Sequence, residues 1–84
     1  MTQLVNIHRF HSEKKDKDYE IIQICRDLNA KELSKGYIGE KIFEEIFLPD
    51  SLVGVLSPKE IGKNIELYYD VYNGKAELAR IDVK

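Results

Sequence analysis

The clearest pattern along the chain is a strict alternation of apolar and polar positions over residues 65–72. Successive side chains of a strand point to opposite faces, so this alternation predicts a half-buried strand. The positions expected to face the core are Ile65, Leu67, Tyr69 and Val71. Asn73-Gly74 then provides the preferred sequence for a type I′ turn. Residues 76–83 should return as the partner strand, with a bulge near Ala79-Arg80, where the alternation breaks.

The first half of the chain predicts a second, longer hairpin. Residues 4–10 and 19–26 are rich in the residue types that favour strands. Between them, residues 12–18 contain six charged side chains and no apolar one, which predicts an exposed turn. Residues 41–48 have apolar positions spaced as in a helix, but their β-branched and aromatic content predicts a strand.

Two further segments carry the signals of single helical turns. They are residues 29–36 and 57–62, and each begins with a capping-box pair and ends at a glycine. Five strands and two such turns in 84 residues predict a mostly β protein with one domain, residues 1–84. A closed or half-closed barrel hides strand edges, so we expect a small five-stranded OB-like barrel, with an SH3-like barrel as the alternative.

Composition and charge exclude several classes of protein. The chain is 43% hydrophobic and 33% charged, as in globular proteins, and its net charge is −2. This excludes a strongly basic nucleic-acid binder, although a local basic face remains possible. No uncharged run is long enough to span a membrane, and no secretory signal is recognisable. The single cysteine, Cys25, cannot form an internal disulfide, which favours the cytoplasm.

No grouping of residues predicts catalysis or metal binding. His8 and His11 should point to opposite faces of a strand, and so should the adjacent Glu44 and Glu45. The glycines stand singly rather than in a phosphate-binding loop. We therefore expect no enzyme activity, no metal site and no cofactor.

The aromatic residues give the one functional signal. Aromatic side chains on a β surface beside a positive groove can stack the bases of a single strand. The plainer interpretation is that they are ordinary half-exposed strand residues. In the turn at residues 12–18, three acidic residues balance three lysines. The candidate nucleic-acid-binding residues are Arg9, Lys14, Lys15, Lys17, Tyr19, Tyr37, Lys41, Tyr68, Tyr72, Lys75 and Arg80.

The order of elements resembles the small helix-destabilising, single-stranded-DNA-binding proteins of filamentous phages and related mobile elements. The likeness lies in a charged first hairpin, in Lys17-Asp-Tyr19 opening the second strand, and in the closing hairpin of residues 62–83. It implies an OB-type barrel, a homodimer and cooperative coating of single strands in replication. Carried over to this chain, the implied site residues are Tyr19, Tyr37, Tyr72 and Arg80. A thin core in so short a chain also favours a dimer.

Two other interpretations stay open. Residues 46–52, followed by Gly62 and a hairpin, resemble the end of swapped-hairpin (AbrB-like) domains, which would imply a regulator that binds duplex DNA. Small acidic β proteins of mobile elements also act by binding and inhibiting a host protein. The expected partners are therefore single-stranded DNA or RNA, a second copy of the chain, or a host protein, with no membrane partner.

Overall fold

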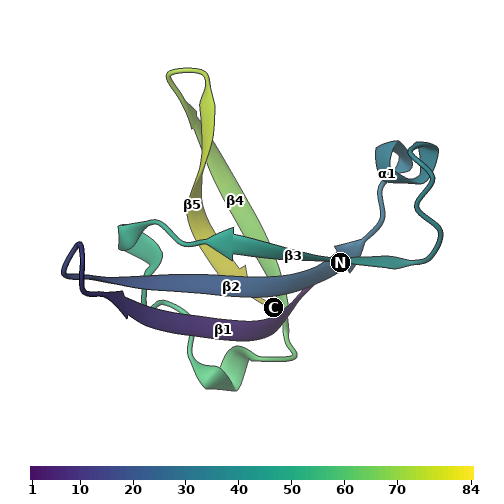
Figure 1. Ribbon diagram of the computed structural model, residues 1–84. Coiled ribbons are helices and arrows are strands. Elements are labelled where there is room, and N and C mark those ends of the chain that lie inside the picture. Colours follow the sequence, from purple (N-terminus) through teal and green to yellow (C-terminus); the bar gives the residue numbers. More distant parts are fainter.

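The computed structural model describes residues 1–84, which form one antiparallel five-stranded sheet (Figure 1). The strands are β1 (Thr2–Ser12), β2 (Lys17–Asp27), β3 (Lys41–Phe47), β4 (Asn64–Tyr72) and β5 (Lys75–Val83). The helical turns are α1 (Ala30–Ser34), η1 (Asp50–Leu52) and η2 (Pro58–Glu60). The expectation of a mostly β fold with five strands is confirmed. None of the helices is long and apolar enough to cross a membrane.

The sheet is not closed into a barrel. Its strand order is β3-β2-β1-β4-β5, so β3 and β5 stand at opposite edges and each has one unpaired side. β1 joins β4 through only two residue pairs, Thr2 with Ile65 and Gln3 with Asn64. Beyond this short junction the β4–β5 hairpin turns away from β1–β2–β3 (Figure 1). The expected closed or half-closed barrel is therefore not confirmed.

The turn, the bulge and the helix cap lie where the sequence predicts them. Asn73 and Gly74 have φ angles of 51° and 76°, and a type I′ turn requires positive φ at both positions. The expected bulge lies at Ala79, which has no partner in β4. A capping box opens α1, where the Asn29 side chain accepts a hydrogen bond from the Glu32 backbone at 2.8 Å. Residues 41–47 form a strand, as their composition predicts.

The core is thin and lies between the two parts of the sheet and the segment that follows β3. Eleven of the 84 residues are buried. The core cluster consists of Leu4, Ile22, Ile24, Leu48, Leu52, Leu56, Ile65, Leu78 and Ile81. Tyr69 and Val71 were expected in this core, but they are 52% and 76% exposed. The reason is that the tip of the β4–β5 hairpin projects away from β1–β2–β3 (Figure 1).

One ion pair with a buried carboxylate ties the segment after β3 to the sheet. Glu20 of β2 is fully buried, and it accepts a hydrogen bond from the half-exposed Arg9 of β1. Arg9 also donates to the Leu56 carbonyl at 2.6 Å, while the Gly54 backbone N–H donates to the second Glu20 oxygen at 3.4 Å. Arg9 and Glu20 together therefore hold residues 54–56 against β1 and β2.

We expect Arg9→Ala to lower the free energy of unfolding by about 3 kcal/mol, because it leaves a buried carboxylate without its charged partner. Urea unfolding followed by circular dichroism measures the change. Lys14→Ala is the matched control, because Lys14 is exposed in the β1–β2 turn, and it should cost less than about 0.5 kcal/mol. Equal stability of the two variants would contradict this role of Arg9.

Candidate functional site

The outer face of β1–β2–β3, which points away from the core, carries aromatic rings, some half-buried and some exposed. Phe10 and Tyr19 are cross-strand partners, with ring centroids 5.6 Å apart and planes 24° from parallel. The ring centroids of His8 and Phe10 are 5.2 Å apart. On β3, Phe43 and Phe47 belong to the same face and are 71% and 64% exposed. This surface is named the aromatic face, and its members are His8, Phe10, Tyr19, Ile21, Phe43 and Phe47.

Three of the rings, those of His8, Phe10 and Tyr19, pack on one another, whereas Phe43 and Phe47 stand apart. Ile21 is the cross-strand partner of both His8 and Phe47, so it lies at the centre of the aromatic face. It is only 9% exposed, although it does not belong to the core cluster. The neighbouring side chains therefore cover it, and the aromatic face is a preformed surface.

A polar row crosses this surface between Phe47 and Phe43. Asn6, Gln23 and Glu45 lie side by side on the three strands. The Asn6 amide donates to Gln23 at 2.8 Å, and Gln23 donates to Glu45 at 3.4 Å. These groups place amide and carboxylate groups beside the rings.

Lysines gather where the aromatic face meets the β1–β2 turn. The Lys17 ammonium lies 5.4 Å from the Tyr19 ring centroid. It also pairs with Asp50 at 2.8 Å, and this hydrogen bond raises the pKa of Lys17. Lys15 lines a shallow hollow together with Phe10, Tyr19 and other side chains of the face. Positive charge therefore borders the rings at this end.

Two acidic residues of the same turn are drawn toward the opposite face. His11 follows Phe10 in β1 and so points away from the rings. Its ring nitrogens lie 2.7 Å from Asp18 and 3.3 Å from Asp16. No ion pair involves Lys14, which leaves its charge available. The charge balance of this turn in sequence is therefore not a balance in space.

Four of the candidate residues lie on the β4–β5 hairpin instead. The Arg80 guanidinium lies 4.2 Å from the Tyr68 ring centroid, and the Tyr68 hydroxyl donates to Glu66. The hydrogen bond to Glu66 raises the pKa of Tyr68. Tyr72 and Lys75 flank the turn, and Tyr72 is 71% exposed. Tyr68 and Arg80 are thus engaged with each other, whereas the Tyr72 ring is open.

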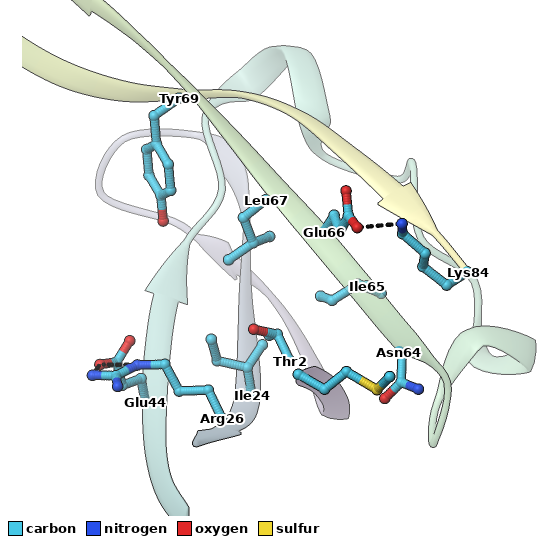
Figure 2. Close-up of a pocket in the computed structure, with 11 residues that line it drawn as sticks. Thr2, Ile24, Arg26, Glu44, Asn64, Ile65, Glu66, Leu67, Tyr69 and Lys84 are labelled. Carbon is cyan, nitrogen blue, oxygen red and sulfur yellow. Dashed lines mark hydrogen bonds and ion pairs between the residues drawn. The ribbon is translucent and has the colours of Figure 1, made fainter. Parts of the chain in front are cut away.

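A cleft of about 650 Å³ opens between β2–β3 and β4 (Figure 2). Arg26 stands on one wall and donates to Glu44 at 2.9 Å and to both Glu32 oxygens at 2.7 and 2.9 Å. Glu66 and Lys84 pair on the other wall. Every charged side chain of the cleft therefore has a partner within the chain. The lining residues are Met1, Thr2, Ile24, Arg26, Glu44, Asn64, Ile65, Glu66, Leu67, Tyr69 and Lys84.

The eleven candidate residues fall into separate places. Lys14, Lys15, Lys17 and Tyr19 lie at one end of the aromatic face, and Lys41 lies at the other end, where it pairs with Asp27. Tyr37 stands in the connection between β2 and β3, and Arg9 belongs to the pair with Glu20. Sequence reasoning missed His8, Phe10, Phe43 and Phe47. The sequence signal that could have identified the phenylalanines is the alternation within residues 41–47. It places both phenylalanines on one face of the strand and the isoleucines on the other.

No group of three His, Cys, Asp or Glu side chains lies close enough to hold a metal ion. Comparison with protein-family models, curated proteins and solved structures finds no match to this chain. The arrangement of its own residues is therefore the basis for assigning a function.

The Arg26 network predicts a loss of stability in acid. Hydrogen bonds, first from Arg26 and then from the Asn29 backbone, lower the pKa of Glu32 from 4.5 to about 2 in the folded protein. The unfolded chain binds a proton at higher pH, so this contribution is complete above the unfolded pKa and is lost as pH falls toward 2. The thermal unfolding midpoint should fall through this range, and Glu32→Gln should flatten the fall. Glu13→Gln, in the exposed turn, should not; identical profiles for wild type and Glu32→Gln would contradict the assignment.

Proposed function

We propose that this protein binds single-stranded nucleic acid on the aromatic face. Bases stack on the half-buried ring of Tyr19 and the exposed rings of Phe43 and Phe47, and the lysines of the β1–β2 turn contact phosphates. The observation that carries the proposal is the set of rings on one sheet surface, two of them exposed, beside Lys14 and Lys15, which form no ion pair. Base stacking tolerates any sequence, because every base has a π face.

The strand order supports an OB-like interpretation of the fold. The order β3-β2-β1-β4-β5 becomes a five-stranded barrel if the edges of β3 and β5 meet. OB-folds bind oligonucleotides on the face of their second and third strands and with the loops between strands 1–2 and 4–5. In this chain these parts are the aromatic face, the Lys14-Lys15 turn and the tip between Tyr72 and Lys75.

The acidic balance of the chain limits the electrostatic contribution. Roughly two to four phosphates would be neutralised per protomer, each contributing about −0.7 to the slope of log affinity against log salt. Stacking then supplies much of the affinity, at about 1–3 kcal/mol per base. The resemblance to phage proteins extends the proposal to DNA strands coated during replication of a phage or mobile element.

We also propose that the protein acts as a homodimer joined through the β4–β5 hairpin. The core-facing stripe of this hairpin continues outward as Tyr69, Val71 and Ala76, which are exposed. A two-stranded hairpin is marginally stable alone in water. A second copy presents the same stripe, so a two-fold contact covers both. No charged side chain belongs to this stripe, which suits a protein partner better than a phosphate backbone.

Fluorescence anisotropy with a labelled single-stranded oligonucleotide tests the binding site. Tyr19→Ala and Phe47→Ala should each weaken binding by about tenfold and leave the salt slope unchanged, because a stacking surface is lost. Tyr19→Phe should be nearly silent, since the ring and not the hydroxyl stacks. The double change of Lys14 and Lys15 to alanine should flatten the slope.

Val55→Ala is the matched control, because Val55 is 51% exposed but lies outside the aromatic face. Unchanged affinity of both ring variants would reject stacking. A duplex and an RNA of the same sequence complete the test. Preference for the duplex favours the AbrB-like alternative, and no binding at low salt favours inhibition of a host protein.

Analytical ultracentrifugation at micromolar concentration tests the dimer. Wild type should sediment with twice the 9.8 kDa mass of the chain. Val71→Asp should give a monomer, because the contact would bury an unpaired carboxylate. Glu77→Ala changes the opposite face of the same hairpin and should leave the dimer intact. A monomeric wild type would reject this contact.

A further inference from the structure

The connection between β2 and β3, residues 28–40, has solvent-exposed apolar side chains at its tip. Ile38 is 99% exposed and Tyr37 is 52% exposed. Gly36 and Gly39 flank them with φ angles of 100° and 143°, which L side chains rarely adopt. No residue of α1 is buried. These thirteen residues therefore add nothing to the core and present their apolar side chains outward.

The base of this connection is held by several hydrogen bonds. The Leu28 backbone N–H donates to the Glu40 carbonyl at 3.1 Å, and this hydrogen bond joins the two ends of the connection. Arg26 of β2 forms two hydrogen bonds with Glu32, and the Asn29 capping box orients the same carboxylate. The tip is thus presented from an ordered base.

The connection also lies at a defined place relative to the aromatic face. It joins the two strands that carry Tyr19, Phe43 and Phe47, at the end opposite the lysine-bearing turn (Figure 1). The last paired positions before it are Cys25 with Phe43, Arg26 with Ile42, and Asp27 with Lys41. A nucleic-acid strand that follows the rings from Tyr19 toward Phe43 reaches this end of the sheet, where the connection is anchored through Arg26 on the cleft side.

Two of the three charged residues of the connection that form no ion pair are lysines. Glu32 is occupied by Arg26, and Asp27 is occupied by Lys41 and by the N-terminal ammonium. Lys31 and Lys35 take part in no ion pair, and among the acidic residues of the connection only Glu40 is unpaired. Proteins that insert apolar side chains between bases combine a wedge residue such as isoleucine with nearby cations.

We infer that Tyr37 and Ile38 form a wedge that enters between bases where a bound single strand leaves the aromatic face. Ile38 separates two neighbouring bases, and the Tyr37 ring covers one of the faces so exposed. The same insertion would open the first base pair when the strand continues into a duplex. This inference rests on the proposed function and adds base unstacking to it.

The test uses single-stranded oligonucleotides that carry 2-aminopurine at one position each, because its fluorescence rises when its neighbours unstack. Wild type should raise the fluorescence at one position near an end of its footprint, and also at the junction of a forked duplex. Ile38→Ala should abolish most of this rise while changing the affinity measured by anisotropy less than about threefold. Val55→Ala, another exposed apolar truncation, should change neither. Ile38 touches no core residue, so the unfolding midpoint should be unchanged.

The outcomes separate the wedge from the binding site. If wild type binds but no position brightens, or if Ile38→Ala brightens as wild type does, the wedge is wrong and the binding site stands. If wild type binds no oligonucleotide, the proposed function fails and the wedge fails with it. If Ile38→Ala alters only sedimentation, the tip contacts protein and the inference is overturned.

Discussion

The short junction between β1 and β4 is the constraint on which the rest of the structure depends. Two residue pairs join these strands, and three further contacts reinforce the joint. The Leu4 N–H donates to the Lys63 carbonyl at 3.0 Å, and the Gly62 N–H donates to the Leu4 carbonyl at 2.8 Å. The Gln3 side chain also donates to Gly62, at 2.8 Å. Because the joint is short, the β4–β5 hairpin diverges, the cleft opens and the edges of β3 and β5 remain unpaired.

This divergence leaves two uncovered apolar surfaces of different chemistry. The aromatic face combines rings with amides and lysines, and its central Ile21 is covered by neighbours. The hairpin stripe of Tyr69, Val71 and Ala76 has no charged member. A phosphate-bearing ligand needs cations, whereas a second copy of an apolar stripe does not. The two surfaces therefore differ in the kind of partner that we propose for each.

The sequence predicted those features that depend on interactions between residues close together in the chain. The Asn73-Gly74 turn, the α1 capping box and the strand at residues 41–47 depend on near neighbours, and all three are confirmed. Closure of a barrel depends on contacts between β3 and β5, far apart in sequence, and no local pattern reports them. The exposure of Tyr69 has the same origin, since alternation gives its face but not whether another element covers that face.

The candidate site was predictable only in part for a related reason. Tyr19 and the lysines of the turn stood out by composition, but the neighbours of Tyr19 are set by strand register. Phe47 lies on the same face as Tyr19 because it pairs with Ile21, which follows Tyr19 by two residues in β2. The separation of charge in the turn depends on His11, which interacts with Asp16 and Asp18 on the opposite face. Counting charges along the sequence could not reveal it.

The arginines and the lysines of the chain differ in whether they form ion pairs, and this difference affects what the surface can recognise. All three arginines are engaged with carboxylates of the chain: Arg9 with Glu20, Arg26 with Glu32 and Glu44, and Arg80 with Asp82. Arginine reads guanine by bidentate hydrogen bonds, whereas lysine meets phosphate as a flexible point charge. Because the cations left without ion pairs are lysines, the proposed binding relies on stacking and on contacts with the nucleic-acid backbone, and it has little dependence on base sequence.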